Sequence, residues 1–99
     1  MSVEIGSRHV VWDDAKAEIN VSKHGIKFED AARVFLDDSR LDYFDESHSD
    51  DEERYITIGM VNAVLFVVYT ERADTTRLIS ARKATKREKE IYYGQYARV

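Results

Sequence analysis

The chain of 99 residues contains no cysteine and no proline, and only four glycines. Without cysteine it can form no disulfide framework, no thiolate nucleophile and no cysteine-ligated zinc site. Such a composition fits a reducing cytoplasm, where we expect the protein to be found. There is no apolar run of about twenty residues and no basic-then-apolar N-terminus, so we expect neither a membrane span nor a signal peptide.

Charge is divided unevenly between the two halves of the chain. The net charge of −4 argues against a nonspecific coat for nucleic acid. Residues 1–53 hold six Lys/Arg and fifteen Asp/Glu, a net of −9, whereas residues 54–99 hold nine and four, a net of +5. The basic half could therefore face a phosphate backbone, while the acidic half faces solvent or a basic partner.

Two helices are predicted in the first part of the chain. Asp13 is a suitable N-cap for a helix through about Lys23, and Gly25 suits the left-handed residue that follows many helices. The inward side of this helix is expected to carry Ala15, Ile19 and Ser22, which recur at helical spacing. A second helix has a core-facing stripe formed by Phe28, Ala31, Ala32 and Phe35.

The rest of the chain predicts strands followed by a C-terminal helix. Strands are expected near residues 41–46, 54–60, 64–72 and 77–83, with a polar loop over 47–53 and a tight turn at Asn62. Thr85 and Glu88 form a capping-box pattern at the start of the last helix. We therefore predict one α+β domain over residues 1–99, with two N-terminal helices, an antiparallel sheet of about four strands and a C-terminal helix.

Residues 67–85 form the most informative segment, because two apolar runs flank a polar turn and carry charge at their ends. Glu71 and Arg72 end the first strand, Arg77 opens the second, and Arg82 and Lys83 close it. Guanidinium groups on rigid strands beside a carboxylate suit phosphate binding. We expect Arg72 and Arg82 to approach one phosphate. Cross-strand ion pairing on a solvated surface is the alternative.

The histidines suggest acid–base or ligand roles. His24 ends the first helix beside Lys23, and a helix C-terminus tends to raise a histidine pKa, which favours a protonated form that binds phosphate or donates a proton. A capping histidine bonded to a carbonyl is the alternative. His9 is isolated. A cation could bind to His48 together with Asp45, Asp50 and Asp51, but we favour a solvated loop there.

Metal-free RNA cleavage suits the remaining charged and aromatic residues. The RNA supplies its own 2′-OH nucleophile, so the protein needs a base, an acid and cations on the developing charge. Tyrosines can stack on unpaired bases. The candidate catalytic residues are Arg54, Glu71, Arg72, Arg82 and His24, without an assignment of acid and base, and the candidate RNA-binding residues are Lys23, Tyr69, Arg77, Lys83 and Tyr92. No metal or cofactor is expected.

Taken in order, short segments over about residues 10–93 make the chain similar to the BrnT family of bacterial type II toxins. The matching positions are Trp12 and Asp13, Lys16 and Ala17, Asn20, residues 23–26 with Phe28, Val34 and Phe35 with Asp37, Glu53 and Arg54, Gly59, residues 67–72, residues 77–84, Glu88 and Tyr92. Each segment alone is common, whereas the ordered set is specific.

The resemblance implies a RelE-like fold and a sequence-tolerant endoribonuclease that blocks translation and arrests growth. It also implies a BrnA-like ribbon-helix-helix antitoxin, with which the toxin forms a heterotetramer that binds operator DNA through the antitoxin. The antitoxin is expected on the basic hairpin and C-terminal helix, although the acidic residues 37–53 could equally hold a basic segment. The alternative is a non-catalytic module that binds an antitoxin and tunes its operator binding.

Overall fold

The computed structural model describes residues 1–48 and 52–95; Asp50 and Asp51 of the suggested cation site lie outside the described residues. The elements in chain order are β1 (Ser2–Ile5), β2 (Arg8–Val11), α1 (Asp14–His24), α2 (Phe28–Ala31), the 3-10 helix η1 (Ala32–Leu36), β3 (Leu41–Asp45), the 3-10 helix η2 (Glu46–His48), β4 (Arg54–Val61), β5 (Ala63–Arg72), β6 (Thr75–Lys83) and α3 (Lys86–Gly94). No described helix is long and apolar enough to cross a membrane.

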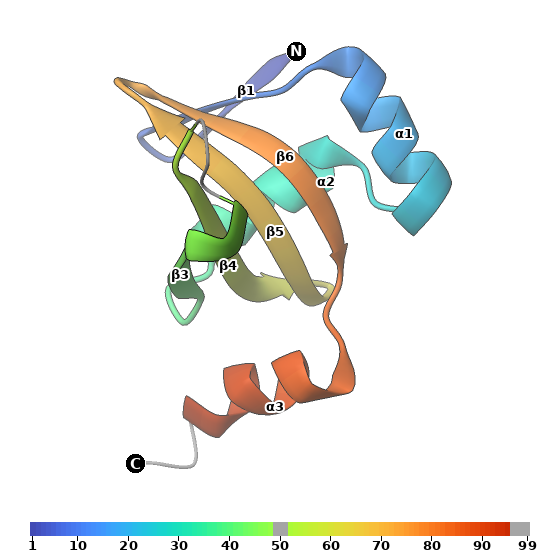
Figure 1. Cartoon of the computed structure of the whole chain (residues 1–99), viewed down its shortest axis with the longest axis vertical. Helices are drawn as coiled ribbons and strands as arrows, with labels where there is room; N and C mark the ends of the chain where they lie inside the picture. Colours follow the sequence, from blue (N-terminus) through green and yellow to red (C-terminus); the bar gives the residue numbers. More distant parts are fainter. Residues whose placement is uncertain (49–51, 96–99) are drawn as a thin grey trace.

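The strands form one six-stranded mixed sheet in the order β1-β2-β6-β5-β4-β3 (Figure 1). All neighbours are antiparallel except β2 and β6, which pair in parallel over His9–Thr75 to Val11–Arg77. The α+β class is confirmed, and the four predicted strands are present as the antiparallel neighbours β3 to β6, but the sheet also contains β1 and β2 and one parallel pairing. The first hairpin was missed because its strands have only four residues each, and no local pattern indicates a parallel pairing across more than sixty residues.

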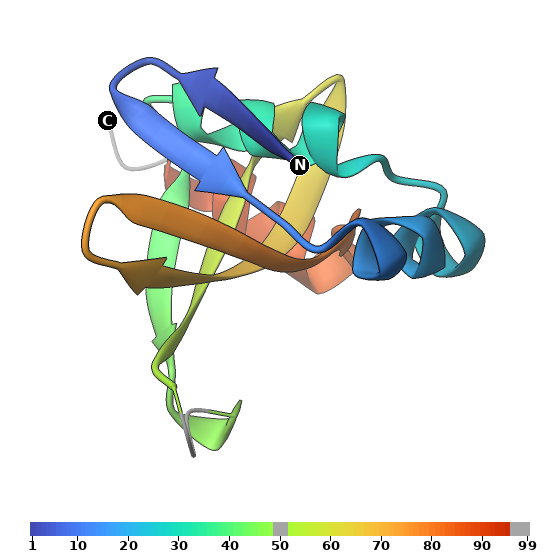
Figure 2. The same cartoon turned by 90° about the horizontal axis from the view of Figure 1, so that it is seen from above.

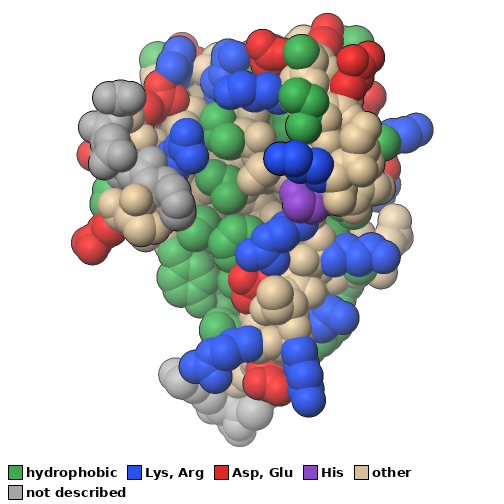
Figure 3. All heavy atoms as spheres, turned by 45° about the vertical axis from the view of Figure 1, so that its right-hand side comes forward, with side chains coloured by type: hydrophobic (Ala, Val, Ile, Leu, Met, Phe, Trp, Pro, Cys, Tyr) green, Lys and Arg blue, Asp and Glu red, His purple; other side chains and the backbone are tan. Residues whose placement is uncertain are grey.

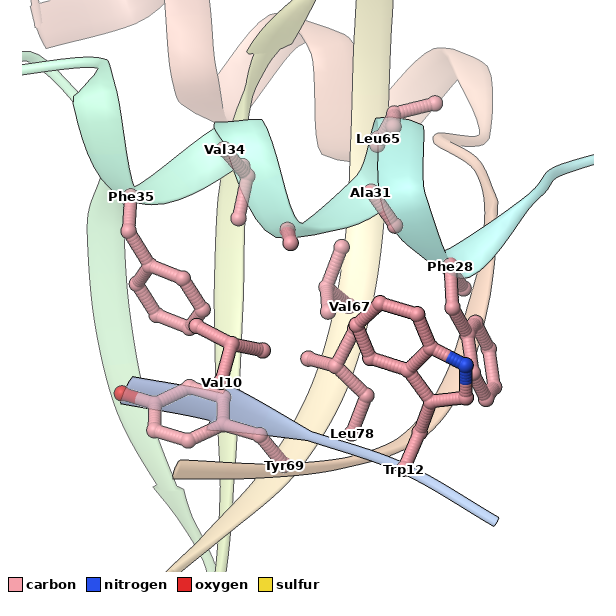
Figure 4. Packing of buried hydrophobic residues seen from close by; sticks show 12 residues of the cluster. Val10, Trp12, Phe28, Ala31, Val34, Phe35, Leu65, Val67, Tyr69 and Leu78 are labelled. Carbon is pink, nitrogen blue, oxygen red and sulfur yellow. The ribbon is translucent and has the colours of Figure 1, made fainter. Parts of the chain in front are cut away.

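The two faces of the sheet differ in what covers them. On the covered face, α2 and η1 pack against alternate residues of β5, including Leu65, Val67 and Tyr69 (Figure 4). The opposite, open face carries the intervening residues, such as Phe66 and Val68. Of the described helices, α3 covers one end of the open face, through a smaller cluster of Ile58, Val64, Ala84 and Tyr92. The open face therefore remains accessible beside α3.

The predicted ends of the first helix are confirmed, but its predicted inward side is wrong. Asp13 accepts hydrogen bonds from the N–H groups of Ala15 and Lys16, and Gly25 has φ 70°. Exposed positions in the structure include Ala15, Ile19 and Ser22, whereas Asn20 is buried. Its amide nitrogen donates to the Ala81 carbonyl at 2.8 Å, and its oxygen accepts from the Ala81 N–H at 3.0 Å. A polar residue faces inward because β6 extends beyond its pairing with β2 and offers backbone groups there.

The stripe of the second helix and the capping box of the last helix are both confirmed. All four stripe residues, Phe28, Ala31, Ala32 and Phe35, are buried, although the segment divides into α2 and η1. Thr85 accepts from the Glu88 N–H at 3.2 Å, and the Glu88 carboxylate accepts from the Thr85 N–H at 2.8 Å. These elements form where short-range pattern and tertiary packing agree.

Asp37 joins three elements behind α3. Its carboxylate accepts from the Met60 N–H at 2.8 Å, the Ser39 N–H at 2.9 Å and the Tyr92 hydroxyl at 2.5 Å. Burial alone would raise the pKa of Asp37, but the hydrogen bonds, that of Tyr92 foremost, outweigh it and hold the pKa below its ordinary value. This junction fixes α3 at one end of the open face.

Candidate functional site

The open face is hollowed between β3–β4 and β6. The hollow has a volume of about 410 Å³ and is lined by Asp45, Ser47, Arg54, Ile56, Phe66, Val68, Ile79, Ser80 and Arg82. Figure 2 shows η2 and the adjoining ends of β3 and β4 projecting to the side of the sheet opposite α2, so they form one wall. The floor is apolar and the rim carries charged groups, an arrangement that can hold a base against the floor and a phosphate at the rim.

Arg82 forms one end of the hollow. It pairs with Phe66 across β5 and β6, and its guanidinium carbon lies 4.0 Å from the centre of the Phe66 ring. Both terminal nitrogens donate to Glu88, at 2.8 and 2.9 Å. Hydrogen bonding from Arg82 is the main reason that the pKa of Glu88 is lowered. The guanidinium is thereby held over the aromatic ring, and its Nε–H is not used in these contacts.

Arg72 and Arg77 lie toward the opposite end of the open face. Arg72 donates through Nε to Glu52 at 2.8 Å, and Nη2 contacts the same carboxylate oxygen. This hydrogen bonding lowers the pKa of Glu52 and raises that of Arg72, and the nearby charge of Arg77 lowers the Glu52 pKa further. Figure 3 looks obliquely onto this face and shows basic side chains from its upper end to α3, beside an apolar patch.

The expected clamp of Arg72 and Arg82 on one phosphate is wrong. Arg72 pairs with Thr75 next to the turn, whereas Arg82 pairs with Phe66, six positions earlier in β5. At roughly 3.3 Å per residue the two positions are about 20 Å apart. The strands are adjacent, as predicted, but an antiparallel hairpin places the end of its first strand beside the start of its second. The two arginines can contact only different phosphates of one strand.

Three predicted residues lie away from the open face. Glu71 is on the covered side, where it accepts from Arg8 at 2.6 Å and from the Thr76 hydroxyl at 3.2 Å. Tyr69 is 6% and Tyr92 2% exposed. Burial, with the charges of Asp42 and Glu71, raises the pKa of Tyr69 to about 12. Both tyrosines belong to the core in this structure and are not placed to stack on a base.

The remaining predicted residues lie beside the open face. Lys23 and His24 are exposed at the end of α1, the helix that contacts β6 through Ala81, and Lys83 is exposed at the end of β6. Thus the structure gathers Arg54, Arg72, Arg77 and Arg82 on one face and sets Lys23, His24 and Lys83 at its border. Among residues 1–48 and 52–95 there is no group of three or more His, Cys, Asp or Glu placed to hold a metal ion.

Sequence reasoning missed the carboxylate partners of the arginines. Glu88 was identified as a capping residue and as a position that matches the family, yet it also orients Arg82; its position three residues after Thr85 gave no indication of that second contact. Glu52 lies in a run of acidic residues that predicted only a solvated loop. Phe66 was assigned to a strand, and only the cross-strand register places it under Arg82.

Comparison with known proteins shows the family of this chain. Residues 12–88 match the family model described as the ribonuclease toxin, BrnT, of type II toxin–antitoxin systems. The chain belongs to the BrnT family. Among solved structures, this BrnT-family protein is similar to the Brucella abortus ribonuclease toxin BrnT, with a TM-score of 0.63 and 26% identity over 78% of this chain and 96% of that chain. No curated protein matches it in sequence. Membership of a toxin–antitoxin family implies an antitoxin partner.

Proposed function

We propose that this chain is a metal-independent endoribonuclease that binds single-stranded RNA along the open face. The observation that carries the proposal is the hollow itself, an apolar floor of Ile56, Phe66 and Val68 beside the guanidinium groups of Arg54 and Arg82. Apolar and aromatic surfaces accept bases of any sequence, while guanidinium groups bind the phosphates between them. Arg72 and Arg77 extend the basic track past the hollow.

Cleavage would use the 2′-OH of the RNA as nucleophile. Attack on the neighbouring phosphorus breaks the bond to the 5′ oxygen and yields a 2′,3′-cyclic phosphate and a 5′-OH. Arg82, oriented by Glu88 and Phe66, would stabilise the charge that develops on the phosphate oxygens. His24 at the border is a candidate proton donor, and Asp45 in the hollow a candidate acceptor. A preorganised guanidinium suits this role because it needs no reorganisation during the reaction.

The proposed biological role is that of a cytoplasmic toxin that inhibits translation and arrests growth until its antitoxin binds. The antitoxin is proposed to be a BrnA-like ribbon-helix-helix protein, which would form a heterotetramer with the toxin and contact operator DNA. The basic second half of the chain, with its net charge of +5, suits an RNA substrate despite the acidic first half.

The experiment is cleavage of a labelled single-stranded RNA by the purified chain in excess EDTA. Continued cleavage with a cyclic phosphate at the 3′ end of the upstream product is the expected result. Activity that disappears in EDTA and returns with magnesium would overturn the mechanism. Induced expression without antitoxin should arrest growth, and the same induction of Arg82→Ala should not.

The second candidate is a non-catalytic module that only binds an antitoxin. One observation favours it: the guanidinium group of Arg72 is paired with the carboxylate of Glu52, and that of Arg82 with the carboxylate of Glu88. Ion pairing reduces their attraction for phosphate. This candidate predicts that the purified chain leaves RNA intact and that its induced expression is tolerated, while antitoxin binding persists.

A further inference from the structure

Strand β3 is an open edge of the sheet. It is last in the strand order and pairs only with β4, from Leu41–Ile58 to Asp45–Arg54 (Figure 1). Within residues 1–48 and 52–95, no other strand lies against its outer side. An edge strand presents backbone N–H and C=O groups to any extended segment that can align with it.

The side chains of β3 suit a protein partner. Tyr43 and Phe44 are 42% and 47% exposed, and their consecutive positions direct them to opposite faces of the sheet. Phe44 rests against Tyr55 with ring centres 5.6 Å apart, so it is already oriented. Exposed aromatic residues that are fixed by a neighbour are the type that anchors protein interfaces. An added strand would meet one anchor on each face.

The charge of the edge determines which partner can pair with it. Asp42 and Asp45 belong to β3, and Glu46 follows at its end; Asp42 lies 3.5 Å from Arg40 and remains partly exposed. Pairing of two copies of this strand would bring carboxylates together, which is unfavourable for directly opposed strands. A segment carrying Lys or Arg at alternate positions would instead be attracted by the same carboxylates. The edge therefore selects a basic partner and disfavours self-association.

We infer that β3 receives an extended, basic segment of the antitoxin as an additional strand. The identity of the partner as an antitoxin rests on the proposed function, while the strand pairing rests on the edge itself. Beyond β3, a space of about 490 Å³ between Leu41, Tyr43, Ile91 and Arg87 leads onto α3. If the antitoxin segment continues past β3, it would enter this space and reach α3 near the open face. The antitoxin could then inhibit RNA cleavage without covering the whole hollow.

Backbone hydrogen exchange tests the strand pairing. The probe is the purified protein encoded by the gene adjacent to that of the toxin. Pairing should slow exchange of amides within residues 41–44, whereas docking by side chains alone would leave them fast. Binding of the antitoxin without such protection overturns the inference, and so does the absence of binding. Protection that rises with toxin concentration alone would show self-pairing and overturn it as well.

Matched charge variants test the selectivity of the edge. Asp42→Lys should weaken antitoxin binding at least about tenfold, because it places like charges against the basic segment. Glu18→Lys, the same change on the exposed surface of α1, should leave binding unchanged. Phe44→Thr preserves strand propensity and should also weaken antitoxin binding. This second variant keeps the inference testable if Asp42→Lys does not fold. Equal affinities for the β3 variants and Glu18→Lys would overturn the inference.

These outcomes are separable from failure of the proposed function. If the wild-type chain neither cleaves RNA nor arrests growth, the ribonuclease proposal fails, but the exchange and affinity measurements stand unaffected. If the ribonuclease proposal holds, Asp42→Lys should arrest growth even with the antitoxin expressed, while the wild-type chain should be rescued.

Discussion

The two faces of the sheet use the same strands for different purposes. In β5, Leu65 and Val67 are 2% and 0% exposed beneath α2 and η1, while their neighbours Phe66 and Val68 line the open hollow. Both faces hold an arginine that lies on a phenylalanine ring and pairs with a glutamate. Arg8 does so on the covered side with Phe35 and Glu71, and Arg82 does so on the open side. Similar local contacts thus occur on both faces, but Arg82 lines the hollow of the open face, whereas Arg8 lies outside it.

The largest effect is expected from the comparison of Arg82→Ala with Arg8→Ala. Removal of a preorganised donor to a developing charge costs about 100- to 1000-fold in rate, so Arg82→Ala should lose that much RNA cleavage. Arg8→Ala removes an equivalent pair and ring contact, so it should alter the rate little. Thermal unfolding should show similar, small losses for both. Equal losses of activity in the two variants would contradict a functional difference between the faces.

Gly59 tests the packing of the covered face. A Cβ at this position would lie 2.5 Å from the Cγ2 of Val34 and 3.1 Å from the Cβ of Arg40. Gly59→Ala should therefore lower the free energy of unfolding by about 1–3 kcal/mol, measured by urea titration. Gly94→Ala is the control, because its Cβ would meet nothing within 4 Å. Cleavage per folded molecule should not change, and an inactive but equally stable Gly59→Ala would refute the assignment to packing.

Asp37 should make the junction behind α3 sensitive to acid. Since its pKa is lowered in the folded protein, its contribution is present above the unfolded pKa, near 3.9, and is lost as pH falls through the folded pKa. Wild type should exceed Asp37→Asn in stability at pH 7, and the difference should shrink below about pH 4. Urea unfolding at several pH values measures this, with the exposed neighbour Asp38→Asn as control. A difference that is constant with pH would exclude the charge as its cause.

The smallest effect is expected at the exposed pair of Arg72 and Glu52. Exposed ion pairs contribute little to stability, so Glu52→Gln should leave the thermal midpoint unchanged. It should strengthen RNA binding a few-fold, because Arg72 is no longer neutralised. The salt dependence should steepen by about 0.7 in log–log slope for each additional phosphate of a single strand that the protein neutralises. Weaker RNA binding by Glu52→Gln would show that the carboxylate positions Arg72 and does not compete with phosphate.

Features that depend on a few neighbouring residues could be predicted from sequence. Asp13, Gly25 and Thr85 end or begin helices through contacts within one turn, and all three were predicted correctly. The inward side of α1 could not be predicted in this way. Asn20 is buried because the backbone of a strand sixty-one residues later needs partners. Hydrophobic periodicity carries no information on such a contact.

The candidate site shows the same division. The hairpin and its arginines are evident in the sequence, but the face on which each side chain lies depends on register. Glu71 and Arg72 are neighbours in the chain and lie on opposite faces. The irregular register at Val68 and Tyr69 also changes the alternation in β6, so that Leu78 and Ala81 both belong to the covered core. No short pattern in the sequence predicts this shift.

By itself the sequence determined the α+β class, the hairpin between β5 and β6, the helix caps and the segments that identify the family. These depend on propensity and on spacing within a few residues. Tertiary structure alone decided the parallel pairing of β2 with β6, the burial of Tyr69 and Tyr92, and the separation of Arg72 from Arg82. Each of these follows from contacts between distant segments, whose free energy depends on how the whole sheet closes around one core.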